Sequence, residues 1–209
     1  MSVEKFNNSI KGIKDYSFEA SRGTAVHELI EKPFANYFKR IYKTVPVMIK
    51  GKTVFEQIMS ENYVVKVDGQ EFTFDLQKDA LLLNCISSIK NEFKGIINEV
   101  PASFIIETSK GPLMINMRLD GIFGNQIVEY KTCKSFKYET YKDSLQWQLY
   151  LMATSAELLK YRVIELSHEP KLHSFQFNQY DIDKPHIIYV VEQLLNYLEI
   201  NNLTSFIEK

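Results

Sequence analysis

The chain has 209 residues, of which 45% are hydrophobic and 24% charged, and these ordinary globular values exclude a disordered or collagen-like chain. Its 25 Lys and Arg residues nearly balance its 26 Asp and Glu residues, which gives a formal net charge of −1. The whole-chain charge therefore does not indicate a nucleic-acid binder, and any basic surface must be local. The length favours one compact domain over residues 1–209, with a motif-bearing core at about 21–200.

Two cysteines, Cys85 and Cys133, form no C-x-x-C pair, which excludes a zinc ribbon or a four-cysteine iron–sulfur cluster within this chain. We expect both to be reduced thiols. No apolar run approaches the ~20 residues that span a bilayer, and the N-terminal segment lacks the apolar stretch of a signal peptide. We therefore expect a soluble, cytoplasmic protein without membrane association.

The first predicted element is a helix that begins near Ser21, where Ser21 or Thr24 can cap it and apolar residues follow at helical spacing. Pro33 should end or kink this helix, and residues 34–42 are compatible with another helix. Residues 53–62 favour neither helix nor strand.

A hairpin is predicted next, because Asp68-Gly69 separates two strand-like runs at 63–67 and 70–74. A helix over about 75–93 follows. The most strand-like part of the chain comes after it, and alternating apolar and polar residues predict strands over 104–108, 113–120 and 126–131.

The remaining pattern predicts a long helix, two short strands and a final helix, at about 141–160, 162–166, 172–177 and 185–201. Helices and strands thus alternate in a way that is typical of an α/β or α+β sandwich with a central mixed sheet.

The clearest chemical pattern is Asp120 followed by Glu129-Tyr130-Lys131. Glu129 and Lys131 are two apart on a strand and share a face, and a turn near 123–125 would bring Asp120 beside Glu129. Two carboxylates next to an ammonium suit Mg²⁺ or Mn²⁺, which can activate a water while Lys131 stabilises charge on a phosphate. The alternative is a salt-bridge ladder on an exposed sheet face.

Two helical patterns could add to this site. His27 lies in Gly23-Thr24-Ala25-Val26-His27, and a neutral imidazole can complete a metal site made of carboxylates. Gln146 and Tyr150 are four apart and share a helix face. Each pattern alone is also compatible with ordinary packing of a helix on the sheet.

In combination, G-T-A-x-H at 23–27, R-L-D-G at 118–121, E-Y-K-T at 129–132 and Q-x-x-x-Y at 146–150 resemble one nuclease family. This family is the RecB-type branch of the PD-(D/E)xK superfamily, and the chain is most similar to small lambda-type and RecE-type phage exonucleases. The resemblance covers about residues 21–200 and implies a restriction-endonuclease-like α/β core. No G-x-x-x-x-G-K-[ST] loop accompanies these motifs, so the chain is not a helicase–nuclease.

The resemblance implies a role for each matching residue. The metal ligands would be His27, Asp120, Glu129 and the backbone carbonyl of Tyr130, with Lys131 as the catalytic lysine. Gln146 and Tyr150 would lie beside the site and contact DNA or orient the active residues. The implied cofactor is one or two Mg²⁺ or Mn²⁺ ions without an iron–sulfur cluster. The implied partners are DNA, a single-strand annealing protein and further copies of the chain.

Lambda-type enzymes carry one more upstream Glu at the metals, and two residues are candidates for it. If the turn between the first two central strands centres near Lys110–Gly111, the neighbour of Asp120 is about residue 101. Glu99 is then better placed than Glu107.

A basic strip at 32–52 contains six lysines and arginines and no acid, with aromatic residues between them. Lys39, Arg40 and Lys43 are its candidate DNA contacts, because phosphate binding needs a local cationic surface and aromatic rings can stack on bases. The alternative is a solvated helix face. Arg22 is a further candidate, because it is expected at the start of the His27 helix, where free N–H groups favour a phosphate.

We expect from these patterns a metal-dependent deoxyribonuclease, most simply an exonuclease for phage-type recombination or DNA processing. Two alternatives remain open: a structure-specific or single-strand endonuclease, and a nuclease-like fold that acts as a DNA-binding or regulatory module.

Overall fold

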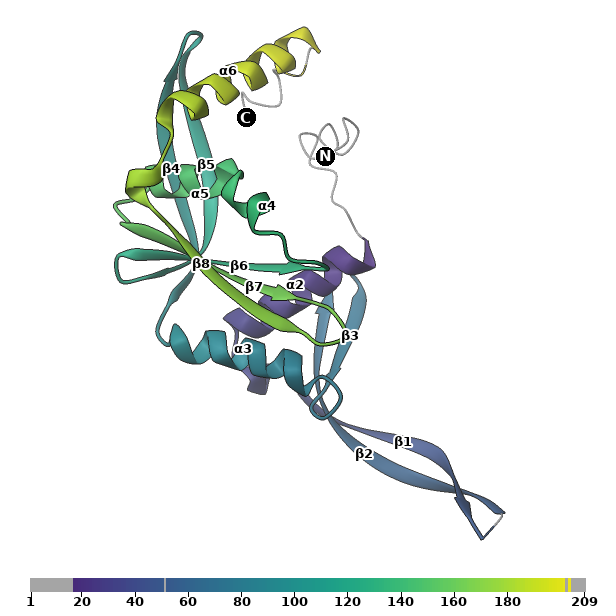
Figure 1. Cartoon of the computed structure of the whole chain (residues 1–209). Helices are drawn as coiled ribbons and strands as arrows, with labels where there is room; N and C mark the ends of the chain where they lie inside the picture. Colours follow the sequence, from purple (N-terminus) through teal and green to yellow (C-terminus); the bar gives the residue numbers. More distant parts are fainter. Residues whose placement is uncertain (1–16, 51, 202, 204–209) are drawn as a thin grey trace.

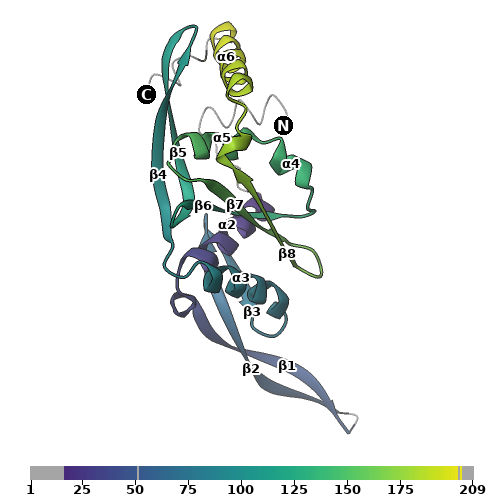
Figure 2. The ribbon, with the colours of Figure 1, turned by 60° about the vertical axis from the view of Figure 1, so that its left-hand side comes forward.

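The computed structural model describes residues 17–50, 52–201 and 203. Five strands form its central sheet, in the order β4 (Ile97–Thr108), β5 (Gly111–Phe123), β6 (Gln126–Cys133), β7 (Leu158–Glu165) and β8 (Lys171–Asn178). Strands β6 and β7 are parallel and the other neighbours are antiparallel. Helices lie on both sides of the sheet (Figures 1 and 2), so the predicted α/β class with a mixed central sheet is confirmed.

The two faces of the sheet have separate cores. On one face, α2 (Phe18–Glu31) and α3 (Ala80–Glu92) pack against Val128 and Tyr130 of β6. On the other face, α5 (Leu145–Met152) packs against Ile127 of the same strand. Successive residues of a strand point to opposite faces, so β6 contributes to both cores, and Glu129 lies on the same face as Ile127, toward α5.

The last helix, α6 (Lys184–Ile200), packs its Ile187 and Val191 against Ile106 at the far end of β4. A short helix, α4 (Tyr138–Lys142), precedes α5. None of the helices in the described part of the chain is long and apolar enough to cross a membrane. Cys85 and Cys133 are free thiols, as expected.

A second sheet consists of β1 (Phe38–Ile49), β2 (Lys52–Val67) and β3 (Gln70–Asp75). The predicted hairpin between β2 and β3 is confirmed, with positive φ at both turn residues, Asp68 and Gly69. This geometry matches the twist of the flanking strands. Beyond the end of β3, β1 and β2 continue as a two-stranded arm that extends away from the rest of the molecule (Figure 1).

The first helix begins earlier than the sequence predicts. It starts at Phe18 because the Ser17 hydroxyl accepts a hydrogen bond from the Ala20 N–H, whereas Ser21 is buried within the helix. Its end is as predicted, since Lys32 adopts an extended conformation immediately before Pro33.

Two expected helices are wrong. Residues 34–36 form a single 3₁₀ turn, and β1 begins at Phe38 because the following residues pair in register with β2. The long helix over 141–160 is two short helices broken at Ser144, whose side chain caps α5, and its last part belongs to β7. In the first place, and over the last residues of the second, pairing with a distant strand outweighs local helical preference.

Candidate metal centre

Strands β5 and β6 separate at the candidate site. They pair only from Phe123–Gln126 to Gly121–Val128, whereas β4 and β5 pair over almost their whole length. Asp120 and Glu129 are the next residues along the two strands. The Asp120 carboxylate accepts a hydrogen bond of 2.7 Å from the Tyr130 N–H, which holds it at the fork. As predicted, the turn therefore brings Asp120 to the Glu129–Lys131 segment.

Helix α2 places two further side chains, His27 and Glu31, close to Asp120. His27 and Glu31 are four residues apart and share a helix face. One potential ligand atom from each of His27, Glu31 and Asp120 lies within 4.8 Å of the other two. Glu31 was not among the candidate ligands predicted from the sequence, although its spacing of four residues from His27 was a usable signal.

Gly23 allows α2 to approach the sheet this closely. A Cβ atom at position 23 would lie only 2.7 Å from Thr132 Oγ1 on β6, which is inside van der Waals contact. The glycine of G-T-A-x-H therefore has a packing role, because it lets the helix that carries His27 lie against the strand that carries Glu129.

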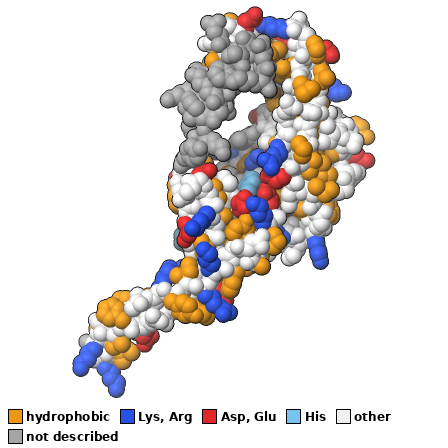
Figure 3. All heavy atoms as spheres, turned by 180° about the vertical axis from the view of Figure 1, so that it is seen from behind, with side chains coloured by type: hydrophobic (Ala, Val, Ile, Leu, Met, Phe, Trp, Pro, Cys, Tyr) orange, Lys and Arg blue, Asp and Glu red, His pale blue; other side chains and the backbone are white. Residues whose placement is uncertain are grey.

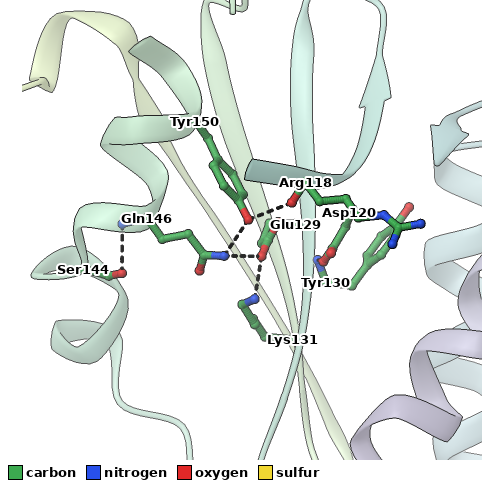
Figure 4. A network of polar contacts seen from close by, with 8 residues as sticks. All are labelled: Arg118, Asp120, Glu129, Tyr130, Lys131, Ser144, Gln146 and Tyr150. Atoms are coloured by element: carbon green, nitrogen blue, oxygen red, sulfur yellow. Dashed lines mark hydrogen bonds and ion pairs between the residues drawn. The ribbon is translucent and has the colours of Figure 1, made fainter. Parts of the chain in front are cut away.

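Glu129 is fully buried, and its two carboxylate oxygens differ in their hydrogen-bond partners. Oε1 pairs with Lys131 Nζ at 2.5 Å and accepts a hydrogen bond of 2.9 Å from Gln146 Nε2. Oε2 has no hydrogen-bond partner among the described residues. Figure 4 shows Glu129 and Lys131 gathered with Gln146 and Tyr150 of α5, with Asp120 beside Tyr130. An ionised oxygen buried without a partner is costly, so Oε2 is a natural ligand for a cation.

Two carboxyl groups of the site have raised pKa values. Burial raises the pKa of Glu129 to about 7, and Asp120 adds to this effect while Lys131 opposes it. Burial also raises the pKa of Glu31 to about 7, with further contributions from Glu99 and Asp120. Crowded carboxylates of this kind are stabilised when a cation binds between them.

The pKa values of the two basic groups of the site, His27 and Lys131, shift in opposite directions. Burial lowers the pKa of His27 and outweighs the Asp120 charge, which acts in the other direction. Its imidazole is therefore neutral near pH 7 and available as a ligand. Burial also lowers the pKa of Lys131, but Glu129 and Asp120 outweigh it and the net pKa is raised. Lys131 thus remains a cation.

A cleft of about 690 Å³ opens over this group and is lined by residues of α2, β4 and β6. Arg22, His27, Glu31, Glu99 and Lys131 are among its walls. Figure 3 shows acidic and basic side chains gathered around a histidine on this side of the molecule. The cleft therefore combines carboxylates with lysine and arginine side chains in its lining, which suits a metal together with an anionic substrate.

The expected position of Glu99 is confirmed. The register of β4 and β5 places Asn98 opposite Gly121 and Val100 opposite Leu119, so Glu99 lies level with Asp120. Its backbone has a positive φ of 57°, and its carboxylate forms an ion pair with Arg118. Glu107 lies at the far end of the hairpin, opposite Pro112.

The candidate DNA contacts lie in different places. Arg22 lines the cleft, but it is a full turn inside α2 and not at the helix start, because the helix begins at Phe18. Lys39, Arg40 and Lys43 are exposed on the β1 arm and do not line the cleft. The alternative of a solvated helix face is therefore wrong, because the basic strip lies mostly on a β-ribbon.

The comparisons with known proteins give partial likenesses. No protein-family model matches the chain, and no curated protein matches it. The crystal structure of SSO0001 is 26% identical, with a TM-score of 0.43, and the match covers 57% of this chain and 58% of that one. A crystal structure of a "Putative exonuclease" from Eubacterium rectale is 12% identical, with a TM-score of 0.42, covering 60% of this chain and 55% of that one. The chain therefore spans less than two thirds of either protein.

Proposed function

We propose that the protein is a divalent-metal-dependent deoxyribonuclease that hydrolyses DNA phosphodiester bonds, acting as an exonuclease in phage-type recombination or DNA processing. The observation that carries the proposal is the buried, unpartnered Oε2 of Glu129, which lies at the strand fork beside a charged lysine. A buried carboxylate oxygen without a hydrogen-bond partner is stabilised when a cation binds to it.

The proposed metal ligands are His27, Asp120, Glu129 and the backbone carbonyl of Tyr130, and Glu31 joins them from α2. The donor set fits Mg²⁺ or Mn²⁺, because it is dominated by carboxylate oxygens with one neutral imidazole. A bound ion would offset the negative charge of a phosphate and lower the pKa of a water molecule.

Lys131 is the proposed catalytic lysine. Its ammonium lines the cleft and keeps its charge through the neighbouring Glu129 carboxylate. It can therefore stabilise the negative charge that grows on the phosphate oxygens while a water oxygen forms the new bond to phosphorus. Gln146 and Tyr150 are proposed positioning residues, since they hold Glu129 from α5.

DNA is the proposed partner, and its contacts fall into two groups. Arg22 lies in the cleft wall, where it can bind the phosphate next to the metal centre. Lys39, Arg40 and Lys43 lie on the arm and can contact more distant phosphates. The same proposal includes a cytoplasmic setting and a single-strand annealing protein as partner, as the family resemblance implies.

The test is digestion of end-labelled linear and circular duplex DNA with Mg²⁺, with Mn²⁺ and with EDTA. We expect metal-dependent loss of the linear DNA only, and losses of at least ~10²-fold in Glu129→Ala and Lys131→Ala, the scale for one transition-state stabiliser. Cleavage of the circle would make the enzyme an endonuclease. Folded variants with unchanged rates would refute the site.

A further inference from the structure

The C-terminal end of α2 cannot complete its hydrogen bonds from its own chain segment. Lys32 is extended, and its N–H closes the last turn on the Glu28 carbonyl. The next residue, Pro33, would be the helical partner of the Leu29 carbonyl, but proline has no N–H. The last carbonyls of a helix need partners from elsewhere. Water or groups outside α2 must therefore supply them.

Lys90 of α3 supplies three of these partners. Its Nζ donates hydrogen bonds to the carbonyls of Leu29 at 3.0 Å, Ile30 at 2.9 Å and Lys32 at 2.6 Å. An ammonium group has three protons, so Lys90 uses all of its donors on the end of one helix. A cation at this end also complements the helix dipole.

The remaining carbonyl of this turn, that of Glu31, has a partner on the central sheet. It accepts a longer hydrogen bond of 3.4 Å from Asn98 Nδ2 of β4. Asn98 lies opposite Gly121, which directly follows Asp120 on β5. The carbonyls of residues 29–32 are thus all bonded to side chains of α3 or β4. These bonds connect the end of α2 to the strand pair that carries Asp120.

We propose that Lys90 is a positioning residue of the metal centre, because it fixes the turn of α2 that carries Glu31. Glu31 is the last residue of the helix, whereas His27 lies a full turn inside it. Without the Lys90 ammonium, three carbonyls would lose their donor and the last turn would open more often. The Glu31 carboxylate would then lie beside His27 and Asp120 less often, and a metal would bind more weakly. This inference rests on the proposed metal centre.

The acidity of the site explains why the last turn needs this support. The carboxylates of Glu31 and Asp120 belong to one group, and Glu99 lines the same cleft. Before a cation binds, their negative charges repel one another. Asp120 lies within a strand and is held by the Tyr130 N–H, so Glu31 is the ligand that fraying of a helix end can move away. The hydrogen bonds of Lys90 oppose that movement.

The test measures Mn²⁺ affinity by electron paramagnetic resonance, under conditions where every variant is folded. Lys90→Met keeps a long side chain but removes the ammonium, and we expect it to bind Mn²⁺ about 10-fold more weakly, the scale for losing a group that supports a metal ligand. Lys94→Met is the control for charge, because Lys94 is exposed just beyond α3. Ile86→Val is the control for stability, because Ile86 is fully buried on α3. Both controls should bind Mn²⁺ like the wild type.

Hydrogen exchange in EDTA tests the support of the helix end without any metal. Lys90→Met should speed exchange of the amides of residues 29–32, whose bonds close the last turn of α2, and leave the amides of residues 22–25 unchanged. Equal acceleration along the whole helix would mean that Lys90 serves the fold in general, and this result would overturn the proposal.

A double variant shows whether Lys90 acts through Glu31. Glu31→Gln removes the ligand that Lys90 positions, so adding Lys90→Met to it should weaken Mn²⁺ binding by less than about 2-fold more. A further loss of about 10-fold in the double variant would contradict action through Glu31, and wild-type affinity in Lys90→Met alone would contradict positioning altogether. A wild type that binds no Mn²⁺ would instead refute the proposed metal centre, and this inference with it.

Discussion

Gln146 and Glu129, which are 17 positions apart in the sequence, share a hydrogen bond of 2.9 Å from Nε2 to Oε1. The same Nε2 donates to the Tyr150 hydroxyl at 2.8 Å, and that hydroxyl donates to the Arg118 carbonyl at 2.9 Å. These bonds connect α5 to β6 and β5 across the strand fork (Figure 4). The position of the Glu129 carboxylate therefore depends on α5.

The first prediction concerns this connection. Gln146→Ala should lower the rate of DNA hydrolysis and the Mn²⁺ affinity by about 10- to 100-fold, the usual effect of losing a group that orients a metal ligand. Ser144→Ala is the control, because Ser144 caps α5 through the Gln146 N–H and leaves the Gln146 side chain in place. Equal losses in both variants would mean that helix stability, and not orientation of Glu129, is responsible.

The second prediction concerns metal binding by α2. Glu31→Gln should weaken Mn²⁺ binding at least ~10-fold in calorimetry or electron paramagnetic resonance, because it removes an anionic oxygen from the His27–Asp120 group. Glu28→Gln on the same helix is the control, since that carboxylate is already held by Lys32 and Tyr37. In crystals soaked in Mn²⁺, anomalous density should lie within ~2.0–2.4 Å of the proposed side-chain ligands, which are His27, Glu31, Asp120 and Glu129. A peak more than ~4 Å from His27 would mean that the metal is held without it.

The third prediction is the pH dependence of stability without metal. The pKa values of Glu31 and Glu129 rise from 4.5 in their ordinary state to about 7 in the folded protein. The folded state therefore holds more protons than the unfolded state between these values, and stability falls as the pH rises from about 4.5 through about 7. The melting temperature should drop across this window, and Glu31→Gln should reduce that drop by more than ~2 °C, which corresponds to about 1 kcal/mol.

Added Mn²⁺ should reverse the fall of stability with rising pH, because carboxylate and imidazole groups bind a metal in their deprotonated form. Stabilisation by the ion should thus grow from pH 5 to pH 8, and calorimetry near pH 6 should detect release of protons on binding. A wild type and a Glu31→Gln variant with parallel melting curves at every pH would refute the raised pKa of Glu31.

Strong local signals explain what the sequence predicted correctly. The strands around Asp120 and Glu129 alternate apolar and polar residues, and Gly124 takes the positive φ that the turn between them needs. The Asp68-Gly69 hairpin has equally specific turn chemistry. These signals sufficed to place Asp120 next to Glu129 and Lys131, and to prefer Glu99 over Glu107.

The failures occurred where a distant partner decides the conformation. Residues 38–49 have no local turn or cap that distinguishes a strand from a helix, and only pairing with 52–63 settles it. Glu31 was missed for a related reason. Its spacing from His27 was visible, but the contact with Asp120 depends on how closely α2 approaches the sheet, and no periodic pattern reports that distance.

The fourth prediction tests how closely α2 packs against the sheet. Gly23→Ala should destabilise the fold by about 1–3 kcal/mol, the usual cost of overpacking, because its Cβ would press on Thr132 Oγ1. Thr132→Ala removes that oxygen, so the double variant should recover most of the loss in chemical denaturation. Additive losses would show that the two residues are not in contact.

The last prediction concerns DNA affinity on the arm. Replacing Lys39, Arg40 and Lys43 together by Ala should flatten the log–log salt dependence of duplex binding by up to ~2–3, because each phosphate contact contributes roughly 0.9. The decrease in this slope should lie at the lower end of that range, because Arg40 is already paired with Glu61. Binding is measured in EDTA to prevent cleavage, and turnover at saturating DNA should survive because these residues lie outside the cleft.

The matched control for the arm variant is Lys66→Ala, Lys78→Ala and Lys94→Ala, which removes the same charge from exposed positions off the basic strip. If non-specific attraction to the whole chain were responsible, both triple variants would flatten the slope equally. A slope unchanged in the arm variant alone would place the DNA path elsewhere, past Arg22 and the lysines at 134, 137 and 142. A preserved slope with lost turnover would instead mean that the arm residues serve the fold or the active site.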